Sequence, residues 1–399
     1  MMATVRVLSV MEATTVTGPV KNLLSFSRLV RSSRFQGGMG PRVDLSIATF
    51  QRSRGPDDPP NAFLDAARAD GVEVDVIRER FRFDPGVIRE LSRIVHRRAP
   101  HIIQTHMVKS HFLVKLSGLW RRYVWVAYHH GYTTTDWKML AYNQLNRWSL
   151  PSATRVVAVC VPFAAELSRA GVAADRITVC HNSVAAPAPV GQREREALRA
   201  TLGVAEDERL VLAVGRLSRE KGHVDLVRAL AILRGLNVEL KWKLAIVGEG
   251  PERRRIERVA RAEGVDRRVV FAGHTGNVWP YYAIADLLAL PSHSEGSPNV
   301  LLEAMAAGLP VVAAAVGGVP ELAAHEKSAL LVPPGDVTAF AAALNRLLTD
   351  VPLARRLGAA AARATVGFSP EAYASSLVNI YRQLVPGARV PAGLRTRSG

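Results

Sequence analysis

Residues 295–321 read EGSPNVLLEAMAAGLPVVAAAVGGVPE, and Glu303 is the only ionisable side chain between the glutamates at the two ends of this stretch. Ser297 can cap a helix, Pro298 fits its first position, and Gly308 can end it. The stretch therefore predicts a helix of about ten residues that ends just before an apolar strand.

Glu303 falls in the second turn of this predicted helix. At about 100° per residue, it shares a face with Val300, Ala304 and Ala307, which is the face expected to pack inward. A carboxylate buried there without a partner costs several kcal/mol. A structural arginine, backbone amides or a ligand could each satisfy it, and the helix sequence leaves these alternatives open.

Glu295 stands before the helix in the loop 292–297, directly after the apolar run 285–290. Loops that follow buried strands are where α/β proteins bind ligands. A helix N-terminus offers free amides and a partial positive charge that suit phosphate, whereas the two carboxylates suit sugar hydroxyls. A nucleoside diphosphate sugar would satisfy both.

The length and composition favour two soluble domains. The chain has 399 residues, of which 48% are hydrophobic, and such a length can bury two cores. The sequence lacks the run of about 18 apolar residues that a transmembrane helix needs, and the N-terminus leads into a strand-like run without a signal-peptide pattern. We therefore expect a cytoplasmic protein. Cys160 and Cys180 have no metal-ligand spacing and are expected to be core thiols, and we expect no metal site.

The formal net charge of +17 is the other unusual property. Nucleic acid, anionic lipid and anionic substrates could each attract such a protein. The sequence has no zinc signature, recognition-helix pattern or basic repeat interleaved with aromatic residues, so we expect no nucleic-acid partner. Clusters such as Arg253–Arg255 are equally typical of solvated surfaces, but the total charge favours peripheral contact with an anionic membrane face.

Strand-like and helix-like runs alternate through the whole chain, which predicts parallel sheets with helices on both faces. The expected strands of the first half are 5–10, 43–49, 72–77, 102–105, 125–129, 155–159 and 177–180. Those of the second half are 210–214, 243–247, 269–272, 286–290, 310–314 and 329–332. The small-residue and proline stretch 183–191 reads as a linker.

The predicted fold class is therefore α/β, with two doubly wound Rossmann-like domains facing a central cleft. We expect the first domain at 1–187, the second at 188–369, a helix at 370–385 returning to the first domain, and a disordered tail at 386–399.

Several residues at the predicted strand ends of the second half suit a phosphate. Gly215 and Arg216 follow one strand, and Lys221 comes five residues after Arg216. Two such cations can neutralise a departing diphosphate, although each could also be an ordinary surface charge. Gly248 and Gly250 close the next strand, where glycines let backbone approach a ligand.

The order of these motifs resembles the donor domain of a family 4 glycosyltransferase, of the retaining group 1 type with the GT-B fold. The resemblance covers about residues 209–335 and is specific, whereas the first half is similar to the acceptor domain more loosely. The motifs that carry it are Gly215-Arg216-Leu217 with Lys221-Gly222, Gly248-Glu249-Gly250-Pro251, Phe271-Ala272-Gly273-His274, Ala285-Asp286 before Pro291-Ser292, the pair Glu295 and Glu303, residues 303–312, and Gly317-Gly318-Val319-Pro320-Glu321.

The resemblance implies a role for each matched residue. Arg216 and Lys221 would bind the diphosphate and stabilise the leaving group, with no metal or other cofactor. Glu303 would hold the ribose hydroxyls. Glu295 would contact the transferred sugar. The remaining donor contacts that it implies are the backbone of Gly296, Ser297, Asn299 and Val300, and the turn at Gly273, His274 and Thr275 beside the base.

In the first half, the loop 15–20 is similar to the glycine-rich loop of this family, but Pro19 replaces a frequent second glycine, so the likeness rests on Gly18. Residues 128–131 match a motif with a histidine near the reacting sugar, and of the two histidines there we choose His130, with a structural role left open. His106, Lys109 and Ser110 could face the acceptor or serve only the fold. Asn182-Ser183 departs from the frequent Asn-Gly, without clear functional weight.

The resulting hypothesis is transfer of a sugar from a nucleotide donor, UDP-sugar favoured over GDP-sugar, to a hydroxyl of a glycan or lipid-linked acceptor, with retention as the family implies. A glycoside hydrolase also uses two carboxylates, but it has no need of paired cations. A nucleotide-sugar epimerase on the same fold and a non-catalytic nucleotide-sugar-binding protein remain the alternatives.

Overall fold

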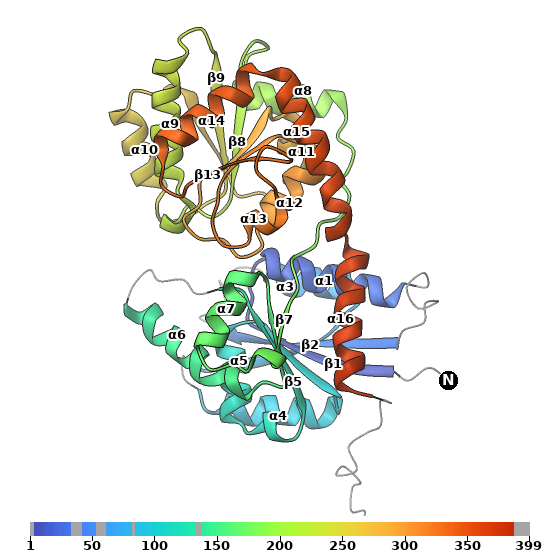
Figure 1. The fold of residues 1–399 in the computed structure, drawn as a ribbon. Coiled ribbons are helices and arrows are strands. Elements are labelled where there is room, and N and C mark those ends of the chain that lie inside the picture. The colour runs from blue at the N-terminus through green and yellow to red at the C-terminus, as the bar shows by residue number, and fades with distance from the viewer. Residues whose placement is uncertain (1–3, 33–41, 53–60, 82–83, 132–136, 387–399) are drawn as a thin grey trace, which may run out of the picture. The chain divides into compact units, whose positions relative to one another are not determined.

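The computed structural model describes residues 4–32, 42–52, 61–81, 84–131 and 137–386. The chain divides into two compact units, drawn in Figure 1: unit 1 comprises Met1–His181 and Pro370–Gly399, and unit 2 comprises Asn182–Ser369. The sequence predicts this division near residue 187, but Asn182 already hydrogen-bonds residues of unit 2. The cleft predicted between the domains stays a prediction, and the predicted tail lies outside the described residues except for its first residue.

The described residues of unit 1 form a seven-stranded parallel sheet with the order β3-β2-β1-β4-β5-β6-β7. All seven strands expected from the sequence are confirmed. Their bounds are β1 (Thr4–Met11), β2 (Arg42–Arg52), β3 (Glu73–Glu79), β4 (Ile102–Thr105), β5 (Val124–His129), β6 (Arg155–Ala158) and β7 (Ile177–Val179). The strand order reverses at β1, which lies between β2 and β4, and such a switch point is where open α/β sheets bind ligands.

Helices cover both faces of this sheet, since most residues along its strands are buried on one face or the other. One core contains side chains of α1, α3 and α16, and the other contains side chains of α4, α5 and α7. Cys160 and Cys180 are buried and form no disulfide, which confirms the prediction of core thiols for both. The helices of unit 1 are α1 (Gly18–Arg31), α3 (Ala62–Ala69), α4 (Gly86–Arg98), α5 (Val108–Leu116), η1 (Leu119–Arg121), α6 (Trp137–Ser149), η2 (Leu150–Ser152), α7 (Val161–Arg169), η3 (Ala174–Arg176) and α16 (Pro370–Leu384).

Helix α16 joins unit 1 although about two hundred residues of chain separate it from the rest of that unit. It packs against α1, where the ring of Phe26 makes edge contacts with Tyr373 at 6.5 Å and with Tyr381 at 6.1 Å between centroids. Aromatic pairs with this geometry contribute beyond the apolar area that they bury.

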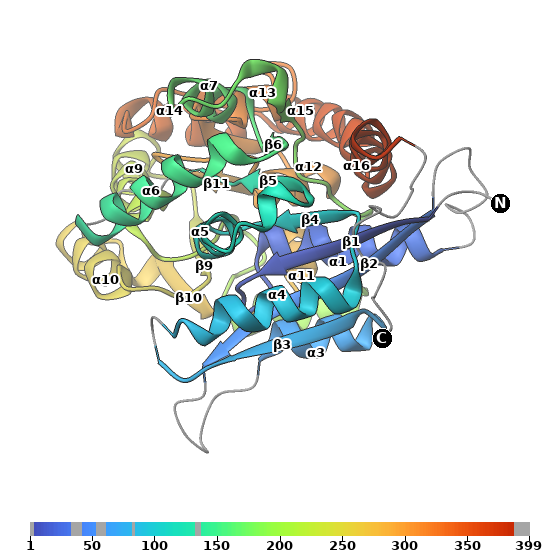
Figure 2. The ribbon, with the colours of Figure 1, turned by 90° about the horizontal axis from the view of Figure 1, so that it is seen from below.

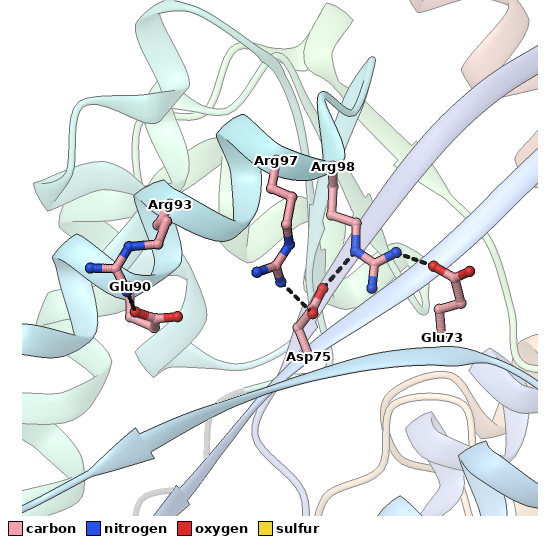
Figure 3. A network of polar contacts seen from close by, with 6 residues as sticks. All are labelled: Glu73, Asp75, Glu90, Arg93, Arg97 and Arg98. Carbon is pink, nitrogen blue, oxygen red and sulfur yellow. Dashed lines mark hydrogen bonds and ion pairs between the residues drawn. The ribbon is translucent and has the colours of Figure 1, made fainter.

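Charged side chains link α4 to the edge strand β3, beside which it lies (Figure 2). Asp75 accepts from Arg97 Nη2 at 2.6 Å and from Arg98 Nε at 2.7 Å, and Arg98 also pairs with Glu73 (Figure 3). The basic residues stand in the last turn of the helix, where they also interact favourably with its dipole. These surface pairs contribute little individually, but they form a network at the sheet edge.

The described residues of unit 2 form a six-stranded parallel sheet with the order β10-β9-β8-β11-β12-β13. All six strands expected from the sequence are confirmed, and the order reverses between β8 and β11. Their bounds are β8 (Arg209–Val214), β9 (Trp242–Val247), β10 (Val269–Gly273), β11 (Leu287–Leu290), β12 (Val311–Ala314) and β13 (Leu330–Val332).

Two cores lie on the two faces of this sheet, one with α9, α10 and α14 and the other with α11, α12 and part of α15. The helices of unit 2 are α8 (Gln192–Thr201), η4 (Arg219–Lys221), α9 (His223–Leu236), α10 (Arg253–Ala262), η5 (Asp266–Arg268), α11 (Trp279–Ile284), α12 (Asn299–Ala306), α13 (Val319–Leu322), α14 (Val337–Thr349), α15 (Val351–Ala364) and η6 (Thr365–Phe368).

The helix predicted around Glu303 is α12. It ends as predicted, because the amides of Gly308 and Leu309 donate to the carbonyls of Met305 and Ala304 in a Schellman arrangement with Gly308 at φ 70°. Its start differs from the prediction: the N-cap is Pro298, and Ser297 makes no capping hydrogen bond. The Ser297 hydroxyl is used elsewhere in the site.

Candidate functional site

Glycines bring the strand ends of unit 2 into close contact. A Cβ atom at Gly248, which follows β9, would lie 2.0 Å from the carbonyl oxygen of Gly215, which follows β8. A Cβ at Gly250 would lie 2.3 Å from the Leu217 carbonyl oxygen, and Leu217 N donates to the Glu249 carbonyl at 2.9 Å. Only glycine fits at these two positions, so backbone groups line this edge of the sheet.

Lys221 and Glu295 meet at this edge. Lys221 Nζ lies 2.7 Å from Glu295 Oε1, and the Ser292 hydroxyl donates to the same oxygen at 2.6 Å. Glu295 is buried, whereas Lys221 is partly exposed. A lysine from the loop after β8 and a carboxylate from the loop after β11 thus form one charged centre at the sheet's switch point.

The two loops are also joined through their backbones. Gly222, at φ 65°, leaves no room for a side chain, because a Cβ there would lie 2.0 Å from the Pro291 carbonyl oxygen. His293 N donates to the Glu220 carbonyl at 2.8 Å. The position of the Lys221 side chain therefore follows from this close backbone packing.

Gly317 holds the other side of Glu295. It has φ 52°, and a Cβ there would lie 1.7 Å from the Glu295 carbonyl oxygen. The amide of Gly318 donates to that oxygen at 3.3 Å. The glycine pair singled out in the sequence thus lets α13 approach the backbone of the Glu295 loop.

Arg216 lies next to Gly215 at the end of β8 and is exposed. Its guanidinium has no hydrogen-bond or ion-pair partner among the described residues. A cation held at a strand end with its donors unused can receive an anionic ligand.

Glu303 is buried, and one partner of its carboxylate is a residue that the sequence did not indicate. The Tyr282 hydroxyl, from α11, donates to Glu303 Oε2 at 3.0 Å. Burial and then the Glu303 charge raise the pKa of Tyr282 well above 10, so the phenol stays a donor. A tyrosine in the apolar helix WPYYAI before β11 was the available signal, but the sequence does not show which carboxylate it reaches.

Asn182 is a second missed residue, and it explains why Ser297 does not cap α12. The Asn182 backbone N–H donates to Ser297 Oγ at 2.9 Å. Its side-chain amide donates to the Ser297 carbonyl at 2.6 Å and to Asn299 Oδ1 at 2.8 Å. Asn182 thus binds the segment that leads into α12, whose first amides lack intrahelical partners.

The remaining expected contacts of unit 2 lie on nearby loops. Gly296 and Val300 are partly buried beside Glu295 and at the start of α12. Gly273 ends β10, His274 is exposed, and the hydroxyl of Thr275 donates to the Asn277 carbonyl at 3.1 Å. Gly273 O accepts from the amide of Gly248 at 2.7 Å. This bond connects the turn to the sheet edge that carries Gly215, Gly248 and Gly250, which we call the glycine edge.

In unit 1, a cluster of histidines lies at the carboxyl ends of β4 and β5. The His106 ring stacks 4.6 Å from Tyr128 and 5.9 Å from His130 between centroids. His129 is buried and lies edge-on to Phe163 at 5.7 Å. His130 is the more accessible of the two histidines between which the sequence could not decide.

Burial keeps these imidazoles neutral near pH 7. Burial lowers the pKa of His130 to about 4, and burial followed by the neighbouring His130 lowers the pKa of His129 to about 3. His111 also falls to a pKa of about 3 through burial, and the pKa of His106 falls well below 6.5 for the same reason. A neutral imidazole can accept or donate one proton in a hydrogen bond, and it adds no charge to the site.

Helix α16 supports this cluster. The Tyr381 hydroxyl donates to Gln104 Oε1, and the Gln104 amide donates to His106 Nε2 at 2.8 Å. With Nε2 as acceptor, His106 carries its proton on Nδ1. Helix α16 thus sets the orientation of a ring that stacks on His130.

The other candidates of unit 1 have structural partners. Gly18 is the first residue of α1 and accepts a hydrogen bond from the Asn22 amide at 3.1 Å. Ser110 Oγ accepts from the Met107 amide at 3.1 Å, as in a capping box at the start of α5, and it also donates to the Met107 carbonyl at 2.7 Å. Lys109 pairs with Glu12 at 3.0 Å and also with Glu79.

No three His, Cys, Asp or Glu side chains in the described ranges come together as ligands for a metal ion.

Solved structures show the same architecture. Anabaena HepE in complex with UDP-glucose aligns with a TM-score of 0.79 at 20% identity, covering 95% of this chain and 99% of that one. WaaG, a glycosyltransferase involved in lipopolysaccharide biosynthesis, aligns with a TM-score of 0.71 at 18% identity, covering 94% and 99%. Both units therefore have the α/β fold of GT-B glycosyltransferases, which confirms the predicted fold class.

Two family models match successive parts of the chain. Residues 194–364 match the glycosyl transferases group 1, and residues 33–183 match the glycosyl transferase 4-like domain. Together these matches support a group 1 glycosyltransferase with the GT-B fold.

Curated relatives include glycosyltransferases with different substrates. D-inositol 3-phosphate glycosyltransferase of Stackebrandtia nassauensis is 35% identical over 237 residues, covering 55% of this chain and 53% of the relative. The lipopolysaccharide core biosynthesis glycosyltransferase LpsD of Rhizobium meliloti is 32% identical, covering 51% and 56%. N-acetyl-alpha-D-glucosaminyl L-malate synthase of Bacillus anthracis is 34% identical, covering 42% and 43%. The chain spans about half the length of the curated relatives that it matches.

Proposed function

We propose that this protein transfers a sugar from a nucleotide-sugar donor to an acceptor hydroxyl with retention of anomeric configuration. The observation that carries the proposal is the charged centre of unit 2, where Lys221 Nζ meets the buried Glu295 at 2.7 Å on the edge that also carries Arg216. Cations that stabilise charge on a leaving diphosphate are what such a transfer requires.

In this proposal the donor binds along the glycine edge. Arg216 and Lys221 bind the diphosphate, and the lack of side chains at Gly215, Gly248 and Gly250 allows it to approach the backbone closely. These cations take the place of a metal, so the reaction needs no cofactor. The similar HepE structure is a complex with UDP-glucose, which supports a UDP-sugar as the first donor to test and a GDP-sugar as the second.

Glu303 binds the ribose hydroxyls, since a buried carboxylate accepts hydrogen bonds from two neighbouring donors. Glu295 and the backbone amides of the segment 296–300 bind the transferred sugar and its phosphate. The turn at His274 and Thr275 lines the base.

The transfer involves no protein nucleophile in this proposal. When Lys221 stabilises charge that develops only as the diphosphate leaves, its removal slows turnover more than it weakens donor binding. Gly18 and the neutral His130 contribute contacts to the reacting groups from unit 1.

We propose a glycan or lipid-linked acceptor, in glycan, exopolysaccharide or glycolipid biosynthesis. The names of relatives in lipopolysaccharide synthesis and the net charge of +17 support this proposal. None of the helices in the described part of the chain is long and apolar enough to cross a membrane. We propose a cytoplasmic enzyme with peripheral contact to an anionic membrane face, which the net charge favours.

The first test is a thermal-shift panel of UDP, GDP, ADP and their common sugars in the presence of EDTA. Wild type should be stabilised by one nucleotide selectively, and Glu303→Ala should lose that stabilisation. Glu239→Ala, an exposed residue of unit 2, is the matched control and should retain it. The absence of any shift in wild type would overturn the proposal.

The second test separates chemistry from binding. Lys221→Ala should lower kcat by about 100-fold or more, the loss typical of a residue that stabilises developing charge, with a smaller change in donor Kd. Near-normal turnover would refute the role of Lys221. In wild type, NMR analysis of the products distinguishes the three candidate functions: a transferase yields a glycosylated acceptor, an epimerase yields an altered nucleotide sugar, and a binding protein yields no product.

A further inference from the structure

Unit 1 exposes large apolar side chains on α5 and α6. Trp148 and Leu116 are each 51% exposed, Leu145 is 37% exposed and Tyr142 is 36% exposed. Leu116 ends α5, and the other three lie on α6, which lies beside α5 (Figure 2). Single exposed apolar residues are ordinary, but a cluster on adjacent elements is typical of an interaction surface.

These side chains belong to one continuous surface, which we call the indole patch. The Phe112 and Trp148 rings lie 6.0 Å apart between centroids. Lys115 Nζ lies 4.5 Å from the centroid of the Trp120 ring and 5.1 Å from that of Trp148, so one ammonium group contacts both indoles. It also donates to the Ser152 hydroxyl. The patch therefore joins α5, η1 and α6 and has a defined geometry.

The surroundings of the indole patch are strongly basic. Arg121 and Arg122 directly follow Trp120 in the chain, Arg147 directly precedes Trp148, and no Asp or Glu occurs in residues 106–131 or 137–165. Arg121, Arg122 and Arg147 are exposed beside the patch. Within the described ranges, no carboxylate pairs with Arg121 or Arg122. Positive charge is thus concentrated around the exposed aromatic rings, which favours an anionic partner.

We propose that the indole patch docks unit 1 on the surface of a bilayer that contains anionic lipids. Tryptophan and tyrosine prefer the interface between acyl chains and headgroups, and lysine and arginine bind anionic headgroups while their stems cover apolar surface. The exposed Leu116 and Leu145 favour lipid over nucleic acid, because they add apolar area that neither phosphates nor base stacking would use.

This inference builds on the membrane contact proposed above and assigns it to particular residues. It is independent of the chemistry of unit 2. Because basic residues near the surface act through long-range charge, docking should weaken as salt screens it.

The experiment is co-sedimentation with vesicles of phosphatidylcholine alone and of phosphatidylcholine with phosphatidylglycerol. Wild type should bind the anionic vesicles, should release at high salt, and should not bind the neutral ones. Trp148→Ala with Leu116→Ala should reduce binding at least about tenfold, since two large side chains no longer insert. Arg121→Glu with Arg122→Glu should reduce binding by at least about 25-fold, at about fivefold for each cation removed.

Matched controls lie on exposed parts of unit 2. Leu236→Ala with Val238→Ala removes comparable exposed apolar area, and Arg254→Glu reverses an exposed charge on α10. These variants should bind as wild type does. Unchanged melting temperatures would show that all variants are folded. Tryptophan emission of wild type should shift to the blue with anionic vesicles, and Trp148→Phe should diminish that shift.

Vesicle binding that the patch variants leave unchanged would overturn the proposal. So would equal losses in the control variants, or displacement from vesicles by a single-stranded oligonucleotide that binds more tightly. The nucleotide thermal shift distinguishes this inference from the proposed function. A wild type that responds to nucleotide but ignores vesicles refutes only the indole patch. A wild type that binds vesicles but responds to no nucleotide refutes only the transferase proposal.

Discussion

Replacing Tyr282 with phenylalanine tests how the structure prepares Glu303 for a ligand. The change removes the hydroxyl that donates to Glu303 Oε2 at 3.0 Å and keeps the ring that fills the core. A hydrogen bond to a charged group contributes about 1.5–3 kcal/mol when its partner is buried. We therefore expect Tyr282→Phe to lose about 2 kcal/mol of unfolding free energy, which is about 4–8 °C in melting temperature for a unit of this size.

The same substitution should weaken nucleotide binding in a selective way. Without the phenol, the Glu303 side chain must lose additional rotamer freedom when ribose binds, at a cost of about 0.5–1.5 kcal/mol, or about 2- to 10-fold in Kd. A 2′,3′-dideoxy nucleotide has no ribose hydroxyls for Glu303 to bind. Its affinity should therefore be weak in wild type and unchanged in Tyr282→Phe.

Calorimetric titration of the preferred nucleoside diphosphate and of its dideoxy analogue, on wild type and variant, measures this difference. Tyr281→Phe is the matched control, because it removes a phenol from the same helix and leaves the hydrogen bond from Tyr282 to Glu303 in place. It should leave both affinities as they are. An equal loss of affinity for both ligands in Tyr282→Phe would refute the reasoning, since the effect would then not pass through the ribose hydroxyls.

Three further predictions concern other parts of the chain. Asn182→Ala should raise the Kd for the donor, because it removes the hydrogen bonds that hold the segment before α12, and it should lower the free energy of unfolding by a smaller amount. Calorimetric titration and melting curves measure the two effects, and a donor Kd equal to that of wild type would contradict the prediction. Gly317→Ala should cost more than about 1 kcal/mol of stability, since a Cβ there would lie 1.7 Å from the Glu295 carbonyl oxygen, whereas Gly276→Ala, with open space around it, should be tolerated. Burial lowers the pKa of His111 to about 3, so below pH 6.5 this residue binds a proton in the unfolded state and not in the folded state. Its contribution to stability is full above pH 6.5 and should fall by about 1.4 kcal/mol per pH unit below it, so that denaturant titrations should show a steeper loss of stability in wild type than in His111→Gln by this amount; equal slopes would contradict it.

Much of the fold could be predicted because strands and helices depend on local patterns. Buried parallel strands appear as short apolar runs, and alternation with helices implies parallel sheets. The helix α12 ends at Gly308 as predicted, because the left-handed conformation that closes a helix is a local preference of glycine. The paired cations and the isolated Glu303 were visible for the same reason: each is unusual against its immediate neighbours.

The contacts that complete the candidate site could not be predicted in this way. Ser297 has the residue type of a helix cap, but its hydroxyl accepts from the Asn182 amide, and 115 positions separate the two residues. The sequence predicted that a buried Glu303 needs a partner. It did not show which residue this is, because no local sequence pattern favours Tyr282 over an arginine elsewhere in the chain.

The sequence by itself therefore determined the two sheets, the glycine edge and the charged residues that lie there, because secondary structure and backbone freedom depend on residues close together in the chain. The tertiary structure alone decided that Lys221 meets Glu295 and that Tyr282 holds Glu303. Such pairs depend on how separate elements pack, and a buried hydrogen bond depends on the distance between side chains rather than on their separation along the chain.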